Sequence, residues 1–442
     1  MIVELFDSYG YDSKGGNFIC NAVRKGLKYE PETRVSRKRN ALCTFLMESG
    51  QETNDINQSP LLYKNKIESD EPIPKHDYSK DYLTFEALGD GTFSFNGNTL
   101  QYSIDNGKTW ETLTGYTATP TITAGSKILW KQTGLTPSIA LGIGTFSSTS
   151  KFNVSGNAMS LLYGDDFVGQ QTLQTYSFQY LFRRCGIVFA KDLVLPATTL
   201  AQSCYYSMFY GCTQLTTAPA LPATTLADSC YGGMFQGCTS LTMAPELPAT
   251  TLAQYCYSYM FNNCTSLTTA PKLPATTLAP LCYNYMFFGC TSLTNTPELP
   301  ATTLAQSCYY SMFYGCTRLT NAPELPATTL AGGCYESMFY GCTSLTTAPE
   351  LPATTLAGGC YRFMFDNCSS LEYLKILYTG SDSPGSMNNV SSEGDLYLYS
   401  QALASNNQFL KGFNGWRLYL NDEYSGIIDI HGGGCGCGGC GC

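Results

Sequence analysis

The heptapeptide LPATTLA begins at Leu195 and recurs six more times, always 26 residues after the previous copy and without an insertion or deletion. The full unit reads LPATTLAxxCYxxMFxxCTSLTxAPE, and the last copy, at Leu351, decays into SLEYLKILYTG. A degenerate half-copy comes first, with Leu181–Cys185 standing where MFxGC belongs, one residue out of phase. Because one short unit cannot bury an apolar face alone, copies at a fixed period must stack into a solenoid with atypical capping ends.

Two periodicities alternate within the unit. Six apolar residues recur three and four positions apart, which predicts one short helix per unit with this face packed inward. In the first copy they are Ala201, Cys204, Tyr205, Met208, Phe209 and Cys212. Pro280 fits the first turn of such a helix, where its missing N–H costs nothing. The remaining segment, LTTAPELP, predicts one short strand per unit, in a parallel ladder that its central proline keeps brief.

Cysteine is the most unusual component of the repeat. Fourteen of the 21 cysteines are repeat positions and are expected to stack as two ladders of small apolar side chains in the core. The alternative, disulfides within a unit, requires an oxidising compartment, and the start MIVELFDSYGYDSKGG lacks the features of a secretory signal. The core positions that we single out are Cys204, Met208, Phe209, Cys212, Cys334 and Cys342.

Charge and composition exclude several classes of protein. The 442 residues include 2 histidines, which leaves little room for histidine-based catalysis, and the net charge of -9 argues against nucleic acid as the main partner. No run of 18 apolar residues exists, so no membrane span is expected. Residues 1–80 hold 24 charged side chains, 12 of each sign, whereas residues 195–376 hold only 12. A break of this size separates different kinds of structure.

The segment before the repeats divides in two. Seven basic residues between Arg24 and Arg39 either dock on an acidic partner or form a solvated face or partly disordered arm. From Tyr82 to Phe167, short runs alternate with period two between turn clusters, which predicts a small antiparallel β-sandwich. Asp105-Asn106-Gly107 signals a hairpin. The surrounding S-x-D-x-G-x-T-W resembles the Asp-box of sialidases, which is a structural hairpin without a catalytic role.

The expected domains are therefore five. They are a charged anchoring segment and linker at 1–80, a β-sandwich at 81–170, the solenoid at 171–376, a β-rich cap at 377–431 and a Gly/Cys tail at 432–442. In the tail, Cys435, Cys437, Cys440 and Cys442 either bind a soft metal or cross-link chains, or are incidental thiols in a low-complexity end. We predict no metal site and no cofactor.

Comparison of the seven copies separates a fixed framework from variable positions. The variable positions lie on the opposite side of the expected helix from the apolar face and are rich in Tyr, Ser, Gly and Asn. Tyrosine offers large contact area at low entropic cost, as on antibody surfaces, whereas drift at solvated positions favours Lys and Glu. The ligand-binding residues that we predict are Tyr206, Tyr210, Tyr255, Tyr259, Tyr285, Phe288, Tyr310, Tyr314, Tyr340 and Phe363.

The repeat unit resembles the BspA-like leucine-rich repeats of gut Bacteroidota and their phages. The resemblance rests on GCTSLTTAPELP after an aromatic-bearing segment, as in Met338 through Pro352, and covers residues 175–376. It implies a right-handed α/β solenoid, although the unit is longer than the commonest form and Ala-Pro replaces branched aliphatic residues in the strand. The β-sandwich in front of the repeats resembles the arrangement in phage and prophage surface proteins of gut bacteria.

These observations predict a non-enzymatic recognition protein that presents an aromatic solenoid face to a cell-surface glycan or protein, through ring stacking. Because no export signal is visible, we expect a phage tail-fibre or other virion component that binds other virion proteins through the N-terminal segment. The expected location is the virion or the cell surface. The alternative is a bacterial surface or secreted adhesin of the BspA type. A glycoside hydrolase would need paired carboxylates, whereas Glu246, Glu298, Glu324 and Glu350 share one repeated position and suggest a solvated stripe. Whether the chain forms homo-oligomers is left open.

Overall fold

The computed structural model describes residues 76–115, 117–133, 142–381, 384–385 and 387–430. Most of the charged N-terminal segment, with its basic cluster, and the Gly/Cys tail with its four cysteines lie outside these residues. No helix within the described ranges has the length and apolarity that crossing a bilayer requires. The elements are η3 (Tyr78–Lys80), β1 (Leu83–Ala87), β2 (Phe93–Gly97), β3 (Leu100–Ser103), β4 (Glu111–Leu113), β5 (Lys127–Gln132), β6 (Gly144–Ser148), β7 (Phe152–Asn157), α4 (Ser160–Tyr163), η4 (Gly164–Asp166), β8 (Ile187–Val194), β9 (Tyr373–Ile376), β10 (Asp395–Leu398), α5 (Gln401–Ala404), α6 (Asn407–Leu410), η5 (Lys411–Phe413), β11 (Arg417–Leu420) and β12 (Glu423–Ile427).

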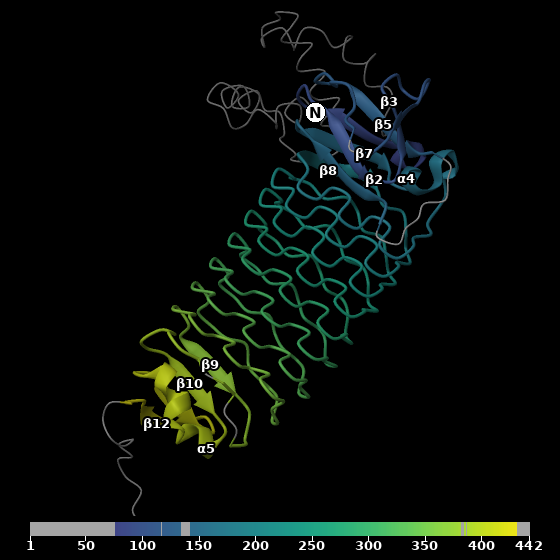
Figure 1. Cartoon of the computed structure of the whole chain (residues 1–442). Helices are drawn as coiled ribbons and strands as arrows, with labels where there is room; N and C mark the ends of the chain where they lie inside the picture. Colours follow the sequence, from purple (N-terminus) through teal and green to yellow (C-terminus); the bar gives the residue numbers. More distant parts are fainter. Residues whose placement is uncertain (1–75, 116, 134–141, 382–383, 386, 431–442) are drawn as a thin grey trace, which may run out of the picture. The chain divides into compact units, whose positions relative to one another are not determined.

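Two sheets pack together before the repeats (Figure 1). One has six strands in the order β4-β3-β5-β1-β7-β8, and the other is the β2-β6 ribbon. Phe85 on β1 contacts Phe93 on β2 and Phe146 on β6, with ring centroids 5.4 and 4.9 Å apart, so an aromatic core joins the two layers. The expected antiparallel sandwich is present only in part, since its second layer is a two-stranded ribbon and β7 and β8 run parallel.

The hairpin expected at Asp105-Asn106-Gly107 connects the antiparallel strands β3 and β4. Asn106 and Gly107 have φ of 64° and 85°, the left-handed conformation that this turn requires. The Asp105 carboxylate accepts hydrogen bonds from the Thr109 hydroxyl (2.7 Å) and N–H (2.9 Å), and these bonds lower its pKa to about 2. The Ser103 hydroxyl also donates to Asp105 (2.8 Å) and accepts from the Gly107 N–H. The polar groups of the Asp-box-like motif therefore serve the hairpin itself.

Strand β8 links the sandwich to the solenoid. It pairs with β7 on one side, and its Phe189 forms a parallel bridge with Thr217 of the first repeat on the other. The degenerate half-copy forms the first coil, because the N–H of Phe182 donates to the Met208 carbonyl (2.8 Å). The corresponding bond in the next coil starts at Phe209, 27 residues after Phe182 rather than 26. The one-residue phase shift of the half-copy is confirmed.

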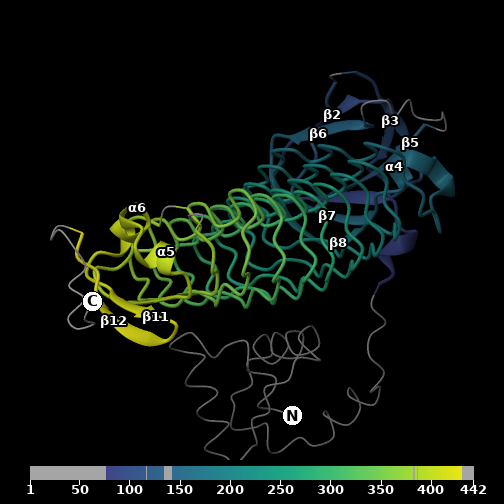
Figure 2. The ribbon, with the colours of Figure 1, turned by 90° about the horizontal axis from the view of Figure 1, so that it is seen from below.

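The prediction of a short helix in each unit is wrong. The N–H of Phe209 donates to the Met234 carbonyl of the next coil (2.9 Å), whereas the N–H of Met208 reaches back to Tyr205 in its own coil (3.2 Å). The alternation recurs along this segment and in the other copies, and Figure 2 shows the resulting coils without helical ribbon. An α-helix keeps its N–H groups for its own carbonyls, so it could not provide this ladder between coils.

The backbone segment that replaces the helix has a conformation that repeats every four residues, and we call this repeat the four-residue wave. Ser203, Ser207 and Gly211 have φ of 52°, 51° and 71°, and each is followed by residues that turn inward. A period of four places two residues inward and the next two outward, so apolar pairs three and four positions apart fit this geometry as well as a helix. The positive-φ positions of the later copies are Ser229, Gly233, Gly237, Tyr255, Tyr259, Asn263, Leu281, Tyr285, Gly289, Ser307, Ser311, Gly315, Gly333, Ser337, Gly341, Gly359, Phe363 and Asn367.

Replacing Leu281 by glycine tests this conformation by the sign of its effect. Leu281 has φ of 57°, which costs a residue with a Cβ about 1–2 kcal/mol, whereas glycine adopts it freely. We expect the free energy of unfolding in urea to be unchanged or to rise by up to about 1 kcal/mol. In a helix the same substitution would lower it by about 1 kcal/mol. A loss of that size would contradict the four-residue geometry.

The strand expected in LTTAPELP is reduced to single bridges. Between β8 and β9, a stretch that the structure describes throughout, Thr269 pairs with Met243 and Asn295 in parallel bridges that do not extend into strands. The position of the strand in the unit was predicted correctly, but its length was not. A second column of bridges, which the sequence analysis missed, runs through the second threonine of LPATTLA, as in Thr225 with Thr251. Both threonines of this motif are exposed in all seven copies.

The solenoid core consists of stacked columns of identical side chains. The six core residues singled out from the sequence, Cys204, Met208, Phe209, Cys212, Cys334 and Cys342, all have 0% exposure, whereas Ala201 is half-buried. Phe261 illustrates the packing: its ring lies parallel to those of Phe235 and Phe287, with centroids 5.7 and 5.6 Å away. Each coil therefore buries its aromatic rings only when both neighbouring coils are in place.

The cysteines of the core are thiols. All fifteen cysteines that the structure describes are free and buried, so disulfides within a unit are not formed. The second cysteine of each copy donates from its thiol to a phenylalanine carbonyl of the preceding coil, as from Cys264 to Phe235 (3.1 Å). Burial raises the pKa of the Cys264 thiol to about 12. Each of these thiols thus remains protonated and acts as a small hydrogen-bond donor between coils.

The last repeat continues into a second sheet of order β12-β11-β10-β9. Strands β9, β10 and β11 are parallel and β12 is antiparallel to β11, with α5 and α6 between β10 and β11 in the chain. Strand β9 is also the final member of the bridge column, since Tyr373 pairs with Thr347. The indole of the fully buried Trp416 donates to the Ser391 carbonyl (2.7 Å) and fixes the loop before β10.

Candidate ligand-binding face

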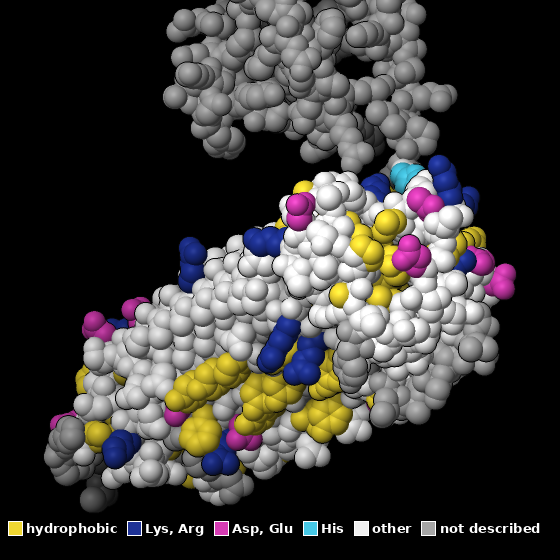
Figure 3. Space-filling model, turned by 45° about the horizontal axis from the view of Figure 1, so that its top comes forward, with side chains coloured by type: hydrophobic (Ala, Val, Ile, Leu, Met, Phe, Trp, Pro, Cys, Tyr) yellow, Lys and Arg dark blue, Asp and Glu magenta, His cyan; other side chains and the backbone are white. Residues whose placement is uncertain are grey.

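The outward positions of the four-residue wave form one continuous surface along the solenoid. None of the ten residues predicted to bind ligand is buried, and Tyr255 and Tyr259 are the most open, at 38% and 36% exposure. Figure 3 shows apolar side chains gathered as a band on this side of the repeats. We call this band the aromatic face; it consists of Tyr206, Tyr210, Tyr255, Tyr259, Tyr285, Phe288, Tyr310, Tyr314, Tyr340 and Phe363.

The rings of the aromatic face pack on one another. Phe288, Tyr314 and Tyr340 occupy the same position in consecutive coils and stack with centroids 4.6 and 4.4 Å apart. Tyr285 joins this column to a second one, because its ring lies 5.7 Å from Phe288 and 4.6 Å from Tyr259. Stacking of this kind holds the side chains in one arrangement before any ligand arrives, which lowers the entropy lost on binding.

The stacking changes what the rings offer to a ligand. Tyr314 has a ring close to parallel on each side, at interplanar angles of 16° and 6°, so both of its faces are occupied. The expectation that the face binds through ring stacking therefore does not hold for Tyr314, which presents its edge and hydroxyl. Burial raises the pKa of Tyr314, and of Tyr259 and Tyr285 in the neighbouring column. These hydroxyls therefore remain protonated hydrogen-bond donors at neutral pH.

Small residues at the other outward positions accommodate the large ones. Gly232 lies beneath Tyr206, since a Cβ added there would come within 3.0 Å of the tyrosine ring. Ser258 and Ser311 are only 5% and 2% exposed although they occupy outward positions, because neighbouring side chains cover them. The variation between copies that the sequence analysis identified is thus complementary from one coil to the next.

The half-copy contributes residues that the sequence analysis missed. The Arg183 guanidinium lies 5.4 Å from the ring centroids of both Tyr180 and Tyr210, and that of Arg184 lies 5.9 Å from Tyr210. Tyr180 packs edge-on against Tyr206 (5.7 Å) and so extends the aromatic face by one coil. The alignment of Leu181–Cys185 with MFxGC already placed both arginines at outward positions, which was the available signal.

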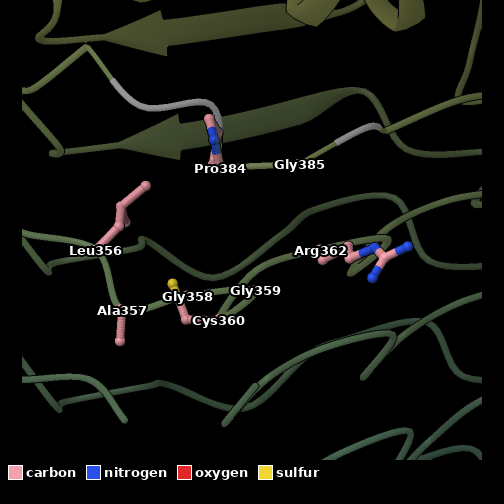
Figure 4. Close-up of a pocket in the computed structure, with 8 residues that line it drawn as sticks. All are labelled: Leu356, Ala357, Gly358, Gly359, Cys360, Arg362, Pro384 and Gly385. Carbon is pink, nitrogen blue, oxygen red and sulfur yellow. The ribbon is translucent and has the colours of Figure 1, made fainter. Parts of the chain in front are cut away.

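The opposite end of the face is different. Arg362 lies 4.6 Å from the ring centroid of Phe363 and 3.8 Å from a carboxylate oxygen of Glu336, so its charge is matched. A cavity of about 350 Å³ lies beside Arg362, between the last coil and Pro384–Gly385 (Figure 4). Leu356, Ala357 and the backbone of Gly358 and Gly359 form much of its wall. The described residues of this lining include no pair of carboxylates and no nucleophile-base pair.

Within the described ranges, no three His, Cys, Asp or Glu side chains gather as metal ligands, and the cysteines of the tail lie beyond those ranges. The repeated glutamates are separate from the aromatic face along the chain, at the end of each unit, and are exposed; they are Glu246, Glu298, Glu324 and Glu350.

Fold and surface together define a repeat protein built to present one face, which is the general design of recognition proteins. Residues 178–277 and 272–382 match the family model described as BspA type leucine rich repeat region (6 copies), somewhat less than half of the chain. This part of the chain is therefore a leucine-rich repeat region of the BspA type. No curated protein and no solved structure matches the chain.

Proposed function

We propose that the chain is a non-enzymatic recognition protein whose aromatic face binds a glycan or protein on a cell surface. The observation that carries the proposal is the contrast between the two sides of each coil. The inward residues are nearly identical in all copies, whereas the outward residues vary and yet place aromatic side chains on one side of six of the seven copies. Partly exposed aromatic side chains gathered on one side of a protein are typical of binding sites.

The physical basis of binding is a rigid, weakly charged surface. Tyrosine combines an apolar ring with a hydroxyl, so it gains from both area burial and hydrogen bonding. Because the rings are already held by stacking, as in Phe288, Tyr314 and Tyr340, little side-chain entropy remains to be lost. No reacting group is needed for this role, and the proposal therefore includes no catalytic residue and no cofactor.

The setting that we propose is a virion, with the chain acting as a tail-fibre or other receptor-binding component. Its support is the β-sandwich in front of a BspA-type solenoid, the arrangement that resembles phage surface proteins. The alternative is a bacterial surface or secreted adhesin of the BspA type. Co-purification of the chain with intact phage particles would favour the virion, and its recovery from the bacterial surface without particles would favour the adhesin.

Simultaneous replacement of Tyr206, Tyr210, Tyr310 and Tyr314 by alanine tests the proposed function. Loss of four aromatic side chains from an interface is expected to weaken whole-cell or glycan binding by at least about 100-fold, since single buried aromatic contacts contribute about 2 kcal/mol or more. The measurement is a binding screen on cells and immobilised glycans, with circular dichroism to establish that the variant folds.

The matched control changes four exposed residues in a single different column of the same solenoid. Thr224, Thr250, Thr276 and Thr302 are the first threonines of consecutive LPATTLA motifs, and all four are exposed. Replacing them by alanine should leave binding unchanged. Binding that survives the tyrosine substitutions, or that the threonine substitutions abolish equally, would mean that the aromatic face is not the binding surface.

A further inference from the structure

The end of the aromatic face nearest the sandwich carries two positive charges that lack a carboxylate partner among the described residues. We call it the Arg-Tyr corner; it consists of Tyr180, Arg183, Arg184 and Tyr210. Both arginines are exposed, and Figure 3 shows two basic side chains at the end of the aromatic band closest to the sandwich. Among the residues that the structure describes, neither arginine forms an ion pair with a carboxylate. Two adjacent cations without a counter-charge favour an anionic ligand.

The corner is also held in place. The rings of Tyr180 and Tyr210 both lie 5.4 Å from the Arg183 guanidinium, and Tyr210 attracts Arg184 as well. Cation–π contacts orient a guanidinium and leave its N–H groups free to hydrogen-bond. A planar guanidinium fixed in this way can pair with a carboxylate or sulfate through two parallel hydrogen bonds, the strongest arrangement for such anions.

The backbone of Arg184 sets it apart from its equivalents in the repeats. Its φ is 60°, and the later copies place only glycine or asparagine at this position, from Gly211 to Asn367. Arginine in the left-handed region costs energy that those residues avoid. Gly211 in the next coil provides the space, because a Cβ added there would lie 3.0 Å from Cγ of Arg184. The half-copy thus carries a charged side chain at the position where every later copy has glycine or asparagine.

We propose that the Arg-Tyr corner and the adjoining aromatic face bind an acidic polysaccharide, with Arg183 and Arg184 pairing with its carboxylate or sulfate groups. This inference rests on the proposed function and names the class of ligand. Beyond the corner the face offers neutral hydrogen-bonding groups, such as the Gln236 amide, which contacts Asn262 (3.4 Å), and the hydroxyl of Tyr314. The hydroxyl groups of sugar units that lie beyond the two arginines require such hydrogen-bonding partners.

A polysaccharide fits this surface better than an acidic peptide. Extended peptides commonly bind by adding a strand to an open backbone edge. Here the N–H groups of the wave already donate either to the next coil, as from Gly211 to Gln236 (2.8 Å), or within their own coil, as from Tyr210 to Ser207 (3.1 Å). The aromatic face therefore has no free edge at these coils. Its equivalent positions recur with each coil, about every 4.8 Å, which suits a ligand made of repeating units.

The test compares four polymers on the full chain. They are polygalacturonate, which carries carboxylates; dextran sulfate, which carries sulfates; neutral dextran; and poly-L-glutamate, which carries carboxylates on a peptide. We expect binding of at least one acidic polysaccharide, weakening as salt is raised, with little binding of neutral dextran and weaker binding of poly-L-glutamate. The ratio between polygalacturonate and dextran sulfate identifies which anion the arginines prefer.

The decisive variant is Arg183→Gln with Arg184→Asn, in which asparagine suits the left-handed backbone. We expect acidic-polysaccharide binding to fall by at least about tenfold, the effect of losing one or more charge-assisted pairs. Arg318→Gln, which removes a charge from an exposed position outside the aromatic face, is the matched control and should bind as the unmodified chain does. Circular dichroism should show that all three proteins are folded and unfold cooperatively.

Three results would overturn the inference. They are unchanged polysaccharide binding by the double arginine variant, absence of binding to both acidic polysaccharides, and binding of poly-L-glutamate as tight as that of polygalacturonate. If any of these occurs while the four tyrosine substitutions still abolish cell binding, the proposed function stands and the ligand class is wrong. If the tyrosine substitutions also leave cell binding intact, both fail.

Discussion

Replacement of Phe261 by alanine is expected to lower the free energy of unfolding by about 3–5 kcal/mol. The side chain is fully buried, and its ring is stacked between those of Phe235 and Phe287 in the neighbouring coils. Removing it leaves a cavity that the fixed spacing of the coils prevents from closing, and it also interrupts the aromatic column in the middle of the solenoid. Urea denaturation followed by circular dichroism measures the effect.

The control for this variant is Phe288→Ala. Phe288 also stacks on a ring of the next coil, but it lies on the aromatic face and is partly exposed. Its loss should cost roughly 1 kcal/mol, because partial burial forfeits less transfer energy and leaves no closed cavity. Equal destabilisation by the two substitutions would contradict the division into inward and outward rings.

Replacement of Gly315 by proline is the second change with a large expected effect. The N–H of Gly315 donates to the Tyr340 carbonyl of the next coil (2.7 Å), and its φ of 70° is outside the range that a proline ring allows. The substitution removes a bond between coils and forces the backbone to change, so we expect a loss of at least about 3 kcal/mol. Thermal unfolding should also become less cooperative, because the two halves of the solenoid are uncoupled.

Gln306→Pro in the same coil is the matched control. It places proline at the position that Pro280 occupies in the preceding copy, and the backbone N–H of Gln306 makes no hydrogen bond to another described backbone group. This variant should unfold within about 0.5 kcal/mol of the unmodified chain. A cost as large as that of Gly315→Pro would show that the alternation of N–H partners does not determine where proline is tolerated.

The sequence predicted the solenoid, the core columns and the outward positions, because all three depend on which residues recur. It did not predict the local backbone. Apolar pairs at Cys204-Tyr205 and Met208-Phe209 fit a period of 3.6 and a period of 4.0 almost equally over so short a segment. The distinguishing signal was the residue at Gly211, which is glycine or asparagine in all copies, as a left-handed position requires.

Other features of the site could not be read from one sequence. Identical positions in consecutive coils bring Tyr314 and Tyr340 within stacking distance, but only the spacing of the coils decides that ring faces are covered and edges remain open. The contribution of Arg183 depended on recognising the half-copy as a complete outward row. The second column of threonine bridges gave no pattern, since exposed threonine is common in loops as well as at bridges.

The integral period of the wave has a consequence for how such a surface can change. With four residues per wave and 26 per coil, every outward side chain has a fixed row and column, as on a two-dimensional grid. Gain or loss of 26 residues inserts or deletes one row and leaves every bond between the remaining coils unchanged. Recombination between the identical LPATTLA segments would therefore rewrite the spacing of the aromatic groups without disturbing the core. Duplication itself can thus supply new surfaces to a protein of this kind.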